Sequence, residues 1–347
     1  MKILIITDAW EPQVNGVVKT YQSVKEEIEK YGHEVTILHP KWSHYNGGEP
    51  TYLWRTFKLP FYTDIEFIRN PWIYELDITG RSYLDYKVHI ATEGPLGAYA
   101  KHILDKEDRP YTTSYHTRIP EYLSRYTKIP KKYFYPYFKW FHSKSKCVMT
   151  PTNGMIDKLK EKGFKNLALW TRGVNHNLFN PKFRQVLHRP YIVCVSRVTK
   201  DKNLDEFCEL KHPHKVLVGD GPYLKELKQK YPHVDFKGKL KGSSLAKVVA
   251  SADAFVFPSK TDTFGIVLLE AIACGTPVLA YAEPGPLEVI EEGVNGCLVE
   301  FDKRFGLYDE LESKLDDVLK IPRDSVHFSA KKWTWEASAL DFLDNIK

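Results

Sequence analysis

Residues 261–278 read T-D-T-F-G-I-V-L-L-E-A-I-A-C-G-T-P-V and follow the short apolar run 254–258. The apolar run predicts a buried strand. The hydroxyl and carboxylate residues after it predict a loop that caps a helix over 266–274. Gly275, just beyond this helix, and Pro277, soon after it, are the matching stop signals. The stretch is therefore predicted to form a strand, a loop and a capped helix.

The predicted helix is apolar nearly all round, which indicates a buried helix, yet it carries Glu270 in its middle. A buried carboxylate without a partner is too costly to keep, so a cation or a set of hydroxyls is expected to meet it. The amides of the first turn, from Phe264 and Gly265 onward, favour an anion. A carboxylate for hydroxyls beside amides for phosphate suggests a nucleotide sugar as ligand.

At these residues the sequence resembles the retaining glycosyltransferases of family 4, which have the GT-B fold. Their signature is Glu-x7-Glu, followed by a helix that ends in a segment like A-C-G-T-P-V; here the acidic pair is Asp262 and Glu270. The resemblance implies that Asp262, one methylene shorter than the usual Glu, is catalytic and faces the transferred sugar. It implies that Glu270 holds the ribose hydroxyls of the donor. The other donor contacts in this stretch would be Thr263, Phe264, Gly265, Ile266 and Val267. The alternative interpretation is an ordinary core helix with an N-capping Asp and a Glu that reaches solvent.

The length of 347 residues favours two domains, each able to bury its own core. We expect an N-terminal acceptor-binding Rossmann-like domain over residues 1–187 and a C-terminal nucleotide-sugar-binding Rossmann-like domain over 188–328. The last segment, 329–347, resembles the family's final helix, which crosses back onto the first domain.

Charge and cysteine content limit the environment of the protein. The net charge of +6 permits an anionic partner without requiring one. The five cysteines show no C-x-x-C and no metal-ligand spacing, which is typical of free thiols in a reducing compartment. No apolar run approaches the ~20 residues of a membrane span, and Met1 leads directly into a predicted strand instead of a signal peptide. These features predict a cytoplasmic protein, with a peripheral position on the inner membrane face as an option.

The loop after the first predicted strand, 2–7, lies at a strand's carboxyl end, where open α/β sheets bind ligands. The loop contains Asn15 and Gly16 but no G-x-G-x-x-G fingerprint. The resemblance implies that Gly16 approaches the donor and Asn15 the acceptor, whereas a glycine needed only for the turn is the alternative. A helix and a strand over 18–38 complete a first β-α-β unit. Residues 40–85, rich in aromatics, Pro and Gly, are left unassigned.

Two further predicted strands, 86–91 and 111–115, are also followed by polar residues. Glu93 after the first is a candidate acceptor contact; alternatively, its carboxylate satisfies free helix amides. The segment H-T-R-I-P-E-Y follows the second strand. In related transferases a histidine in this segment lies beside the anomeric centre, and the resemblance gives that catalytic role to His116. The same segment supplies two acceptor candidates, Arg118 and Glu121.

Residues 128–146 hold six lysines, seven aromatic residues and no acidic residue. This composition suits an anionic bilayer surface, with the aromatics at the headgroup level and Lys131 and Lys132 as candidate contacts. It equally suits a nucleic-acid backbone, with aromatics stacked on displaced bases. The third interpretation is a helix whose aromatics pack inward and whose lysines are solvated.

In the second domain, Arg197 and Lys202 lie five residues apart in the loop after the predicted strand 191–195, so both cations can converge on one diphosphate. The family places an Arg-x4-Lys pair here to stabilise the departing diphosphate, and the resemblance makes both residues catalytic. The segment R-G-V-N at 172–175 matches the family's R-G-V-D, with Asn175 in place of the usual Asp. The remaining donor contacts follow the next two strands: Gly219, Lys239 and Leu240.

Together with these features, the resemblance implies an α/β protein of the GT-B type, with two Rossmann-like domains facing across a cleft. It also implies the retaining transfer of a hexose from a UDP- or GDP-linked sugar to a hydroxyl of a lipid or glycan. Two cations and a helix terminus would neutralise the leaving diphosphate, so no metal and no other cofactor is expected. Two alternatives stay open. One is a phage-type enzyme that glycosylates hydroxymethylated bases in DNA, and the other is a GT-B sugar-nucleotide 2-epimerase, which needs no acceptor.

Overall fold

The computed structural model describes residues 1–11, 13, 15–40, 56–59, 62–68, 84–185, 190–302, 307–308 and 311–347. The chain divides into two compact units. Unit 1 comprises Met1–Thr171 and Trp335–Lys347, and unit 2 comprises Arg172–Thr334.

Both unit boundaries differ from those predicted at 187/188 and 328/329. Val174 and Phe179 are buried in the core of unit 2, so the chain has already entered that unit at Arg172. Ala330 and Trp333 belong to the same core, and the carbonyl of Trp333 accepts a hydrogen bond from the amide of Val174 (3.2 Å). The segments that contain Val174 and Trp333 therefore belong to unit 2, because their apolar side chains are buried in its core.

Unit 1 is built on a six-stranded parallel sheet in the order β2-β1-β5-β6-β7-β8. Its strands are β1 (Lys2–Ile6), β2 (Glu34–Leu38), β5 (Tyr86–Ile90), β6 (Tyr111–Ser114), β7 (Val148–Thr150) and β8 (Leu167–Leu169). Strand β1 is a nearly continuous apolar run and β6 is buried along its whole length, because helices cover both faces of a parallel sheet. The strand order reverses between β1 and β5, which makes the carboxyl ends of these two strands a ligand-binding position.

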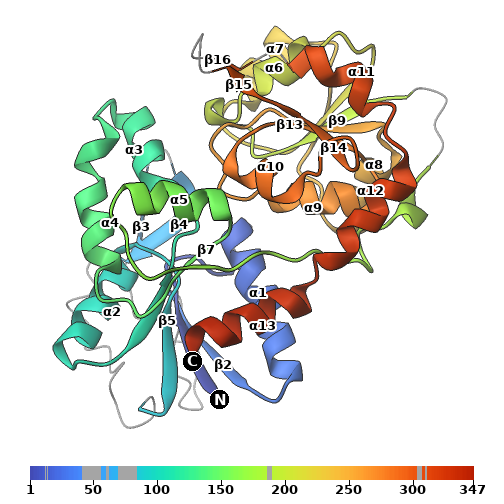
Figure 1. The fold of residues 1–347 in the computed structure, drawn as a ribbon. Coiled ribbons are helices and arrows are strands. Elements are labelled where there is room, and N and C mark those ends of the chain that lie inside the picture. Colours follow the sequence, from blue (N-terminus) through green and yellow to red (C-terminus); the bar gives the residue numbers. More distant parts are fainter. Residues whose placement is uncertain are drawn as a thin grey trace. The chain divides into compact units, whose positions relative to one another are not determined.

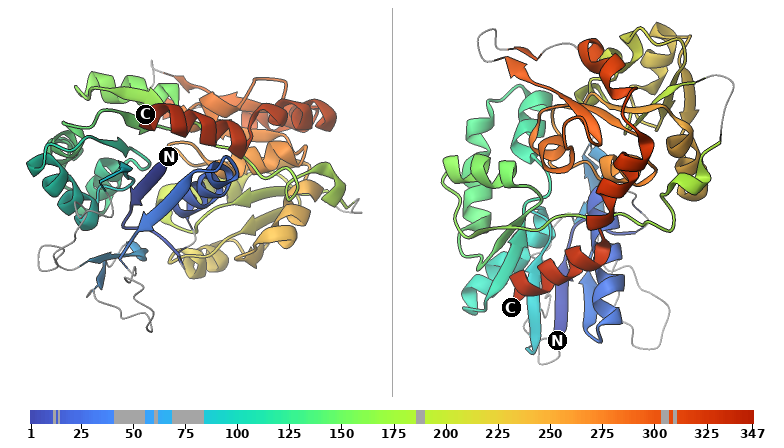
Figure 2. Two further views of the ribbon diagram at one scale, coloured as in Figure 1. Left: turned by 90° about the horizontal axis from the view of Figure 1, so that it is seen from below. Right: turned by 45° about the vertical axis from the view of Figure 1, so that its right-hand side comes forward.

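The helices of unit 1 lie on both faces of this sheet, with α2, α4 and α5 on one side and α1 and α13 on the other (Figure 1). They are α1 (Gly16–Lys30), α2 (Pro95–Lys106), α3 (Ile119–Thr127), α4 (Tyr135–His142), α5 (Asn153–Glu161) and α13 (Trp335–Ile346), with a 3-10 turn η3 (Lys131–Tyr133) before α4. The final helix α13 lies against α1, and the N- and C-termini lie close together (Figure 2). The indole nitrogen of Trp170 donates to the carbonyl of Ser338 (2.9 Å), which fixes α13 to the end of β8.

A short antiparallel pair, β3 (Thr56–Leu59) and β4 (Tyr62–Ile68), lies in the region that could not be assigned from the sequence. Its strands alternate polar and apolar residues, as in K-L and D-I-E-F, over too few positions to stand out among the neighbouring aromatics.

Unit 2 has a second six-stranded parallel sheet, in the order β11-β10-β9-β12-β13-β14. Its strands are β9 (Ile192–Val195), β10 (Lys215–Val218), β11 (Asp235–Gly238), β12 (Ala254–Phe257), β13 (Val278–Tyr281) and β14 (Gly296–Val299). Counted from β9, the order is 3-2-1-4-5-6, that of a doubly wound nucleotide-binding sheet. Here the order reverses between β9 and β12.

Helices α6 and α7 cover one face of this sheet, and α8 and α9 cover the other (Figure 1). The helices are α6 (Leu204–Glu209), α7 (Leu224–Lys230), α8 (Gly242–Ser251), α9 (Ile266–Ala273), α10 (Pro284–Val289), α11 (Leu315–Val318) and α12 (Arg323–Ser329). The 3-10 turns are η4 (Pro181–Phe183), η5 (Lys200–Lys202), η6 (Leu311–Lys314) and η7 (Ala330–Lys332), and a short antiparallel pair joins β15 (Phe301–Asp302) to β16 (Leu307–Tyr308). The predicted strand, loop and helix of 254–274 are present as β12 and α9.

Two doubly wound α/β units are therefore present, as the sequence predicted. Within the described part of the chain, no helix is both long enough and apolar enough to cross a membrane.

Candidate functional site

Arg197, Lys202 and Asp262 come together at the strand-order reversal of unit 2. Arg197 and Lys202 follow β9, and Asp262 follows the neighbouring strand β12. Lys202 Nζ lies 2.8 Å from Asp262 Oδ1 and 2.8 Å from Oδ2. The Lys202 side chain is 9% exposed and that of Asp262 is 27% exposed. The position of the Lys202 ammonium group is therefore fixed, and its partner Asp262 is partly exposed to solvent.

The charges of this cluster keep Asp262 ionised. Burial alone would raise the pKa of its carboxyl group, but several groups oppose it. The charge and hydrogen bonds of Lys202, a hydrogen bond from Ser259 and the charge of Arg197 together hold the pKa of Asp262 below its usual value. A second carboxylate, Asp201, is 1% exposed and lies 3.8 Å from Lys202 Nζ. Asp201 was not predicted, since nothing in the sequence says that its side chain turns inward.

The loop after β10 presses its backbone against the loop that carries Arg197. The amide of Ser196 donates to Val218 (3.0 Å), and that of Val198 donates to Asp220 (2.9 Å). Gly219 has φ +148°, and a Cβ there would lie 1.8 Å from the carbonyl oxygen of Ser196. Only glycine fits this approach, so the predicted site residue Gly219 has a structural role that is independent of any ligand.

Helix α9 begins at the same edge and supplies the remaining predicted residues. Gly265 is its N-cap in a left-handed conformation (φ +85°), which lets the chain turn sharply from β12 into the helix. Phe264 is 3% exposed and packs edge-on against Trp333, so only its backbone is available to a ligand. Glu270 is 4% exposed in the middle of the helix, as predicted from its apolar surroundings. The predicted contacts Thr263, Ile266 and Val267 are partly exposed.

Lys239 and Leu240 follow β11, two strands away from β9. The carbonyl of Gly238 accepts a hydrogen bond from the amide of Gly219 (2.8 Å), which ties this loop to the one after β10. Lys239 is exposed, whereas Leu240 packs partly against the core. All predicted donor residues of unit 2 therefore follow the carboxyl ends of three strands of one parallel sheet, β10, β11 and β12.

In unit 1, Asn15 is the N-cap of α1, and Gly16 is the first residue of this helix. Asn15 Oδ1 accepts hydrogen bonds from the amides of Val17 and Val18, both 3.0 Å long. Asn15 Nδ2 is buried and has no hydrogen-bond partner among the described residues. The amide oxygen of Asn15 thus caps α1, while its Nδ2 group has no acceptor among the described residues.

Asp8, which follows β1, is buried and was not among the predicted site residues. Its carboxylate accepts hydrogen bonds from the amides of Leu96 (3.0 Å) and Gly97 (3.4 Å) and from the hydroxyl of Thr92 (2.9 Å). It therefore caps α2 from the neighbouring strand. Burial, and to a smaller extent the charge of Glu93, raise the pKa of Asp8 to about 6 despite these hydrogen bonds. An acidic residue directly after a buried parallel strand was the available signal.

Glu93 is enclosed on the face of the sheet that α4 covers. Glu93 Oε1 lies 3.5 Å from His142 Nε2, and neither atom has a hydrogen-bond partner among the described residues. His142 Nδ1 lies 2.8 Å from the hydroxyl of Thr113, and the hydroxyl of Tyr137 donates to the carbonyl of Glu93 (2.6 Å). Glu93 is 6% exposed and does not accept the helix amides that were its alternative role, because Asp8 accepts those of Leu96 and Gly97.

His116 follows β6 and is 9% exposed. Its Nε2 lies 2.8 Å from the hydroxyl of Tyr21 on α1, and its ring packs against Trp170 with the centroids 5.7 Å apart. Tyr21 was not a predicted site residue. Its contact with His116 joins positions 95 residues apart, which no local pattern reveals.

The other acceptor candidates of unit 1 lie on α3 and η3. Arg118 is the N-cap of α3. Glu121 accepts a hydrogen bond from the hydroxyl of Tyr135 (2.7 Å) and lies 3.8 Å from Lys131 Nζ, so its carboxylate already has partners within the unit. Lys131 and Lys132 are both exposed.

The aromatic residues of 128–146 divide between the core and the surface. Tyr135, Phe138 and Phe141 are buried, as the third interpretation of this segment requires. Four apolar or aromatic residues of the segment are 40% to 64% exposed: Ile129, Tyr133, Tyr137 and Trp140. The inward-packing interpretation therefore accounts for only part of the aromatic content.

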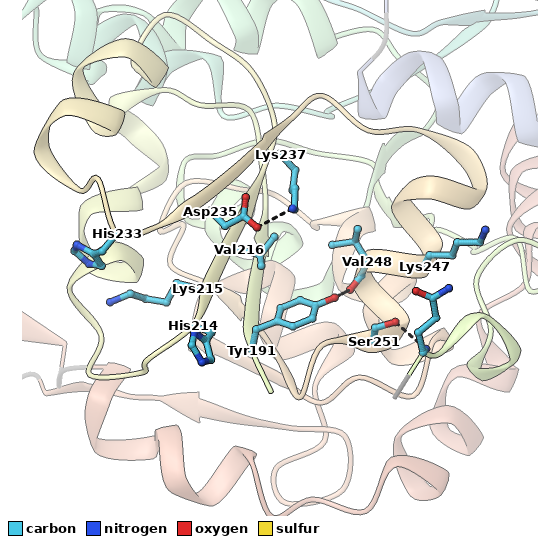
Figure 3. Close-up of a pocket in the computed structure, with 11 residues that line it drawn as sticks. Tyr191, His214, Lys215, Val216, His233, Asp235, Lys237, Lys247, Val248 and Ser251 are labelled. Atoms are coloured by element: carbon cyan, nitrogen blue, oxygen red, sulfur yellow. Dashed lines mark hydrogen bonds and ion pairs between the residues drawn. The ribbon is translucent and has the colours of Figure 1, made fainter. Parts of the chain in front are cut away.

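A separate pocket of about 380 Å³ in unit 2 contains none of the predicted site residues (Figure 3). It is lined by residues at or before the starts of β9, β10 and β11, such as Tyr191, Lys215 and Asp235, and by Val248 and Ser251 of α8. It therefore lies at the amino ends of the strands, the edge opposite to Lys202. Among the described residues, no group of three or more His, Cys, Asp or Glu side chains could hold a metal ion.

Comparison with known proteins gives the family. Residues 14–178 match the family model described as Glycosyltransferase Family 4, and residues 178–333 match that described as Glycosyl transferases group 1. A GDP-mannose-dependent alpha-mannosyltransferase of Corynebacterium glutamicum is 28% identical over 99% of this chain and 88% of its own length. An alpha-monoglucosyldiacylglycerol synthase of Streptococcus pneumoniae is 27% identical over 99% of this chain and 83% of its own length.

Solved structures show the same fold at lower identity. Sucrose-phosphate synthase from Thermosynechococcus elongatus has a TM-score of 0.74 and 18% identity, covering 99% of this chain and 98% of that one. The Anabaena protein HepE, in complex with UDP and glucose, has a TM-score of 0.68 and 16% identity over the same shares of the two chains. The chain therefore belongs to the glycosyltransferases, with a Family 4 domain followed by a group 1 domain in the GT-B fold.

Proposed function

We propose that this glycosyltransferase moves a hexose from a nucleoside-diphosphate sugar to a hydroxyl of a lipid or glycan, with retention at the anomeric carbon. The observation that carries the proposal is the cluster of Lys202, Asp262 and Arg197 beside the first turn of α9. GDP-mannose is the first donor to test, because the relative that is 28% identical is named for this donor. UDP-hexoses are the second, since HepE was solved with UDP and glucose.

In this proposal unit 2 binds the donor. Lys202 and Arg197 hold the diphosphate, the amides at the start of α9 add donors for its oxygens, and Glu270 accepts the ribose hydroxyls. Cations and amides aimed at the leaving group stabilise the charge that develops on it, and such electrostatic stabilisation lowers the barrier of many transfer reactions more than any other effect. The contact between Lys202 and Asp262 keeps the ammonium group in position before the donor arrives.

The chemical step breaks the bond between the anomeric carbon and the donor's phosphate oxygen, and forms a bond from the same carbon to the acceptor oxygen. Attack on the face that the diphosphate leaves preserves the anomeric configuration. The acceptor's proton passes to the departing phosphate oxygen, so the charges balance without a protein base. His116 contacts the sugar beside the reacting carbon, and no metal ion takes part.

The acceptor is proposed to be a lipid hydroxyl at an anionic membrane surface. The relative that is 27% identical is named as a synthase of a glucosyldiacylglycerol. Exposed Tyr133 and Trp140 stand in a segment with six lysines and no acid, a combination suited to the headgroup layer. Such a surface would bring the lipid hydroxyl to the protein.

The test is donor consumption measured with GDP-mannose, UDP-glucose and UDP-galactose in the presence of EDTA. Each donor is offered with anionic vesicles containing diacylglycerol or a monoglycosyl lipid, with a soluble glycan, and with hydroxymethylated duplex DNA. We expect a glycolipid product from one donor with vesicles. Product formed only on DNA would replace the proposal with DNA modification, and isomerised donor without any acceptor would replace it with epimerisation. Activity that requires a divalent metal ion would contradict the proposal that no metal takes part.

A further inference from the structure

His116 is one end of a chain of buried hydrogen bonds across unit 1. The hydroxyl of Tyr21 lies 2.8 Å from His116 Nε2 and 2.8 Å from His89 Nε2. His89 Nδ1 in turn lies 2.8 Å from the hydroxyl of Thr112. Tyr21 and His89 are fully buried, and Thr112 is 4% exposed. Hydrogen bonds in such a low-dielectric interior are strong and fix the orientation of the groups that they join.

The fold itself places these side chains together. Tyr21 projects from α1, while His89 on β5 and Thr112 on β6 are cross-strand partners in the sheet. The hydroxyl of Ser114, also on β6, lies 3.1 Å from that of Tyr21 and 2.9 Å from His89 Nε2. These four residues lie on one face of the sheet, the face that α1 and α13 cover.

Aromatic side chains surround the chain of hydrogen bonds. The ring of Trp170 packs against His116 with centroids 5.7 Å apart and against Tyr21 at 5.5 Å. Phe342 of α13 packs edge-on against His89 at 5.0 Å. Because these rings are buried, water does not compete for the hydrogen bonds.

The number of protons limits how the chain can be arranged. The hydroxyl of Tyr21 has one proton but lies within hydrogen-bond distance of three groups: Nε2 of His116, Nε2 of His89 and the hydroxyl of Ser114. Its 3.1 Å contact donates this proton to Ser114, so the Tyr21 oxygen is left to accept from His116, which then carries its own proton on Nε2.

We propose that Tyr21 and His89 are positioning residues that hold His116 as the Nε2–H imidazole and fix its ring beside the reacting sugar. The inference rests on the proposed function, which places His116 at the anomeric carbon. It goes further by naming the residues that set the tautomer and orientation of His116. The competing explanation is structural: the hydrogen bonds would serve only to hold α1 on the sheet.

The experiment compares Tyr21→Phe with a matched variant, Tyr111→Phe. Tyr21→Phe removes the hydroxyl but keeps the ring that packs on Trp170. The hydroxyl of Tyr111 donates to Asp105 (3.0 Å) rather than to a histidine, and this side chain is 3% exposed in the same sheet. Both variants remove one tyrosine hydroxyl and keep the ring, so a general loss of stability from losing a tyrosine hydroxyl would appear in both. Ser114→Ala is a smaller perturbation of the same chain of hydrogen bonds.

Long-range ¹⁵N NMR of the histidine rings reads the tautomer directly, with the His116 signals assigned from a His116→Gln sample. In the full-length wild type at pH 8 we expect His116 to be protonated on Nε2 and not on Nδ1. In Tyr21→Phe we expect a mixture of tautomers for His116, and in Tyr111→Phe the wild-type spectrum. Since misplaced groups commonly cost up to about 100-fold in rate, we expect kcat of Tyr21→Phe to fall about 10- to 100-fold with the donor KM within about 2-fold.

The outcomes separate the inference from the proposed function. A wild-type His116 protonated on Nδ1, or a His116 spectrum unchanged in Tyr21→Phe, overturns the inference. Equal loss of kcat in Tyr21→Phe and Tyr111→Phe also overturns it, because that result shows a structural role. A fully active His116→Ala would instead remove the catalytic role of His116 from the proposed function, and the tautomer of His116 would still be decided by the spectra.

Discussion

Lys202 Nζ lies 2.8 Å from both carboxylate oxygens of Asp262, and this contact joins the loops after β9 and β12, the two strands between which the order of the unit 2 sheet reverses. Parallel sheets bind ligands at this position because the loops diverge there. A diphosphate that binds at this edge meets an ammonium group whose position is already fixed. Fixing it beforehand reduces the conformational entropy that donor binding would otherwise cost.

Lys202→Ala should lose transfer activity while the fold survives. We expect kcat/KM to fall by about 100- to 1,000-fold, the usual loss when one stabilising donor is removed from a developing anion. The matched variant is Lys200→Ala in the same turn η5, whose side chain is 70% exposed and pairs with Glu226 at 2.9 Å. Its activity should stay within about 2-fold, since exposed ion pairs contribute little. Initial rates at matched circular dichroism decide between them, and an active Lys202→Ala would remove Lys202 from the site.

Glu270→Gln should weaken donor binding through the ribose. We expect the donor Kd to rise about 10-fold or more, because the amide of Gln has no negative charge and has one acceptor oxygen fewer than the carboxylate for the ribose hydroxyls. The wild type should lose a similar factor with a 2′-deoxyribose donor. Combining the variant with the deoxy donor should then cost little more, because the two changes remove one shared contact. Fully additive losses in calorimetric titrations would show that Glu270 does not meet the ribose.

Because the pKa of Asp8 is raised, the free energy of unfolding should fall as pH rises. Its pKa is raised to about 6, so the folded protein holds this proton more tightly than the unfolded chain does. A carboxyl group with a raised pKa contributes most to the free energy of unfolding below its unfolded pKa of 3.8. This stabilisation is lost as pH rises through the folded pKa of about 6. At about 1.4 kcal/mol per pKa unit, the change is roughly 3 kcal/mol.

Asp8→Asn removes this titration, so the wild type should lose roughly that free energy of unfolding relative to the variant between pH 4 and pH 7. Denaturant unfolding at the two pH values measures it. Asp344→Asn is the control, because it removes one carboxylate from a side chain that is 72% exposed. A constant stability difference between Asp8→Asn and the wild type at the two pH values would contradict the raised pKa.

The prediction of β12 and α9 succeeded because one continuous stretch holds the apolar run, the loop and the glycine stop. The proximity of Arg197, Lys202 and Asp262 could be predicted for the same reason, since each follows a recognisable apolar strand, whereas Asp201 was missed. Asp8 and Tyr21 were missed because their partners lie 88 and 95 residues away in the sequence. Spacing along the chain carries no information about such contacts.

The unit boundaries were misplaced for a related reason. Val174 lies between β8 and β9, Trp333 lies between η7 and α13, and neither segment shows by itself which core will bury it. Only the fold brings the two together, at 3.2 Å between the Val174 amide and the Trp333 carbonyl. The hydrogen bond from the hydroxyl of Tyr135 to Glu121 is another contact that no local pattern reveals, and Glu121 stays a candidate acceptor contact.

Lys131→Ala/Lys132→Ala should weaken binding to anionic vesicles. Each lysine near such a surface contributes about 1 kcal/mol, so the pair should lower partitioning about 10- to 30-fold at low salt. The control pair is Lys200→Ala/Lys320→Ala in unit 2, which removes the same charge from side chains that are 70% and 75% exposed. Vesicle sedimentation at two salt concentrations measures both. Equal losses in the two pairs would mean that net charge alone drives binding.

The most direct test of the central claim is the anomeric configuration of the product. The enzyme is incubated in EDTA with ¹³C-labelled GDP-mannose or UDP-glucose and vesicles carrying the lipid acceptor, and the C1–H1 coupling of the product is read by NMR. We expect an α-linked glycolipid from the α-linked donor, formed by the wild type and not by Lys202→Ala. A β-linked product, or an unchanged yield in Lys202→Ala, would contradict the proposed mechanism.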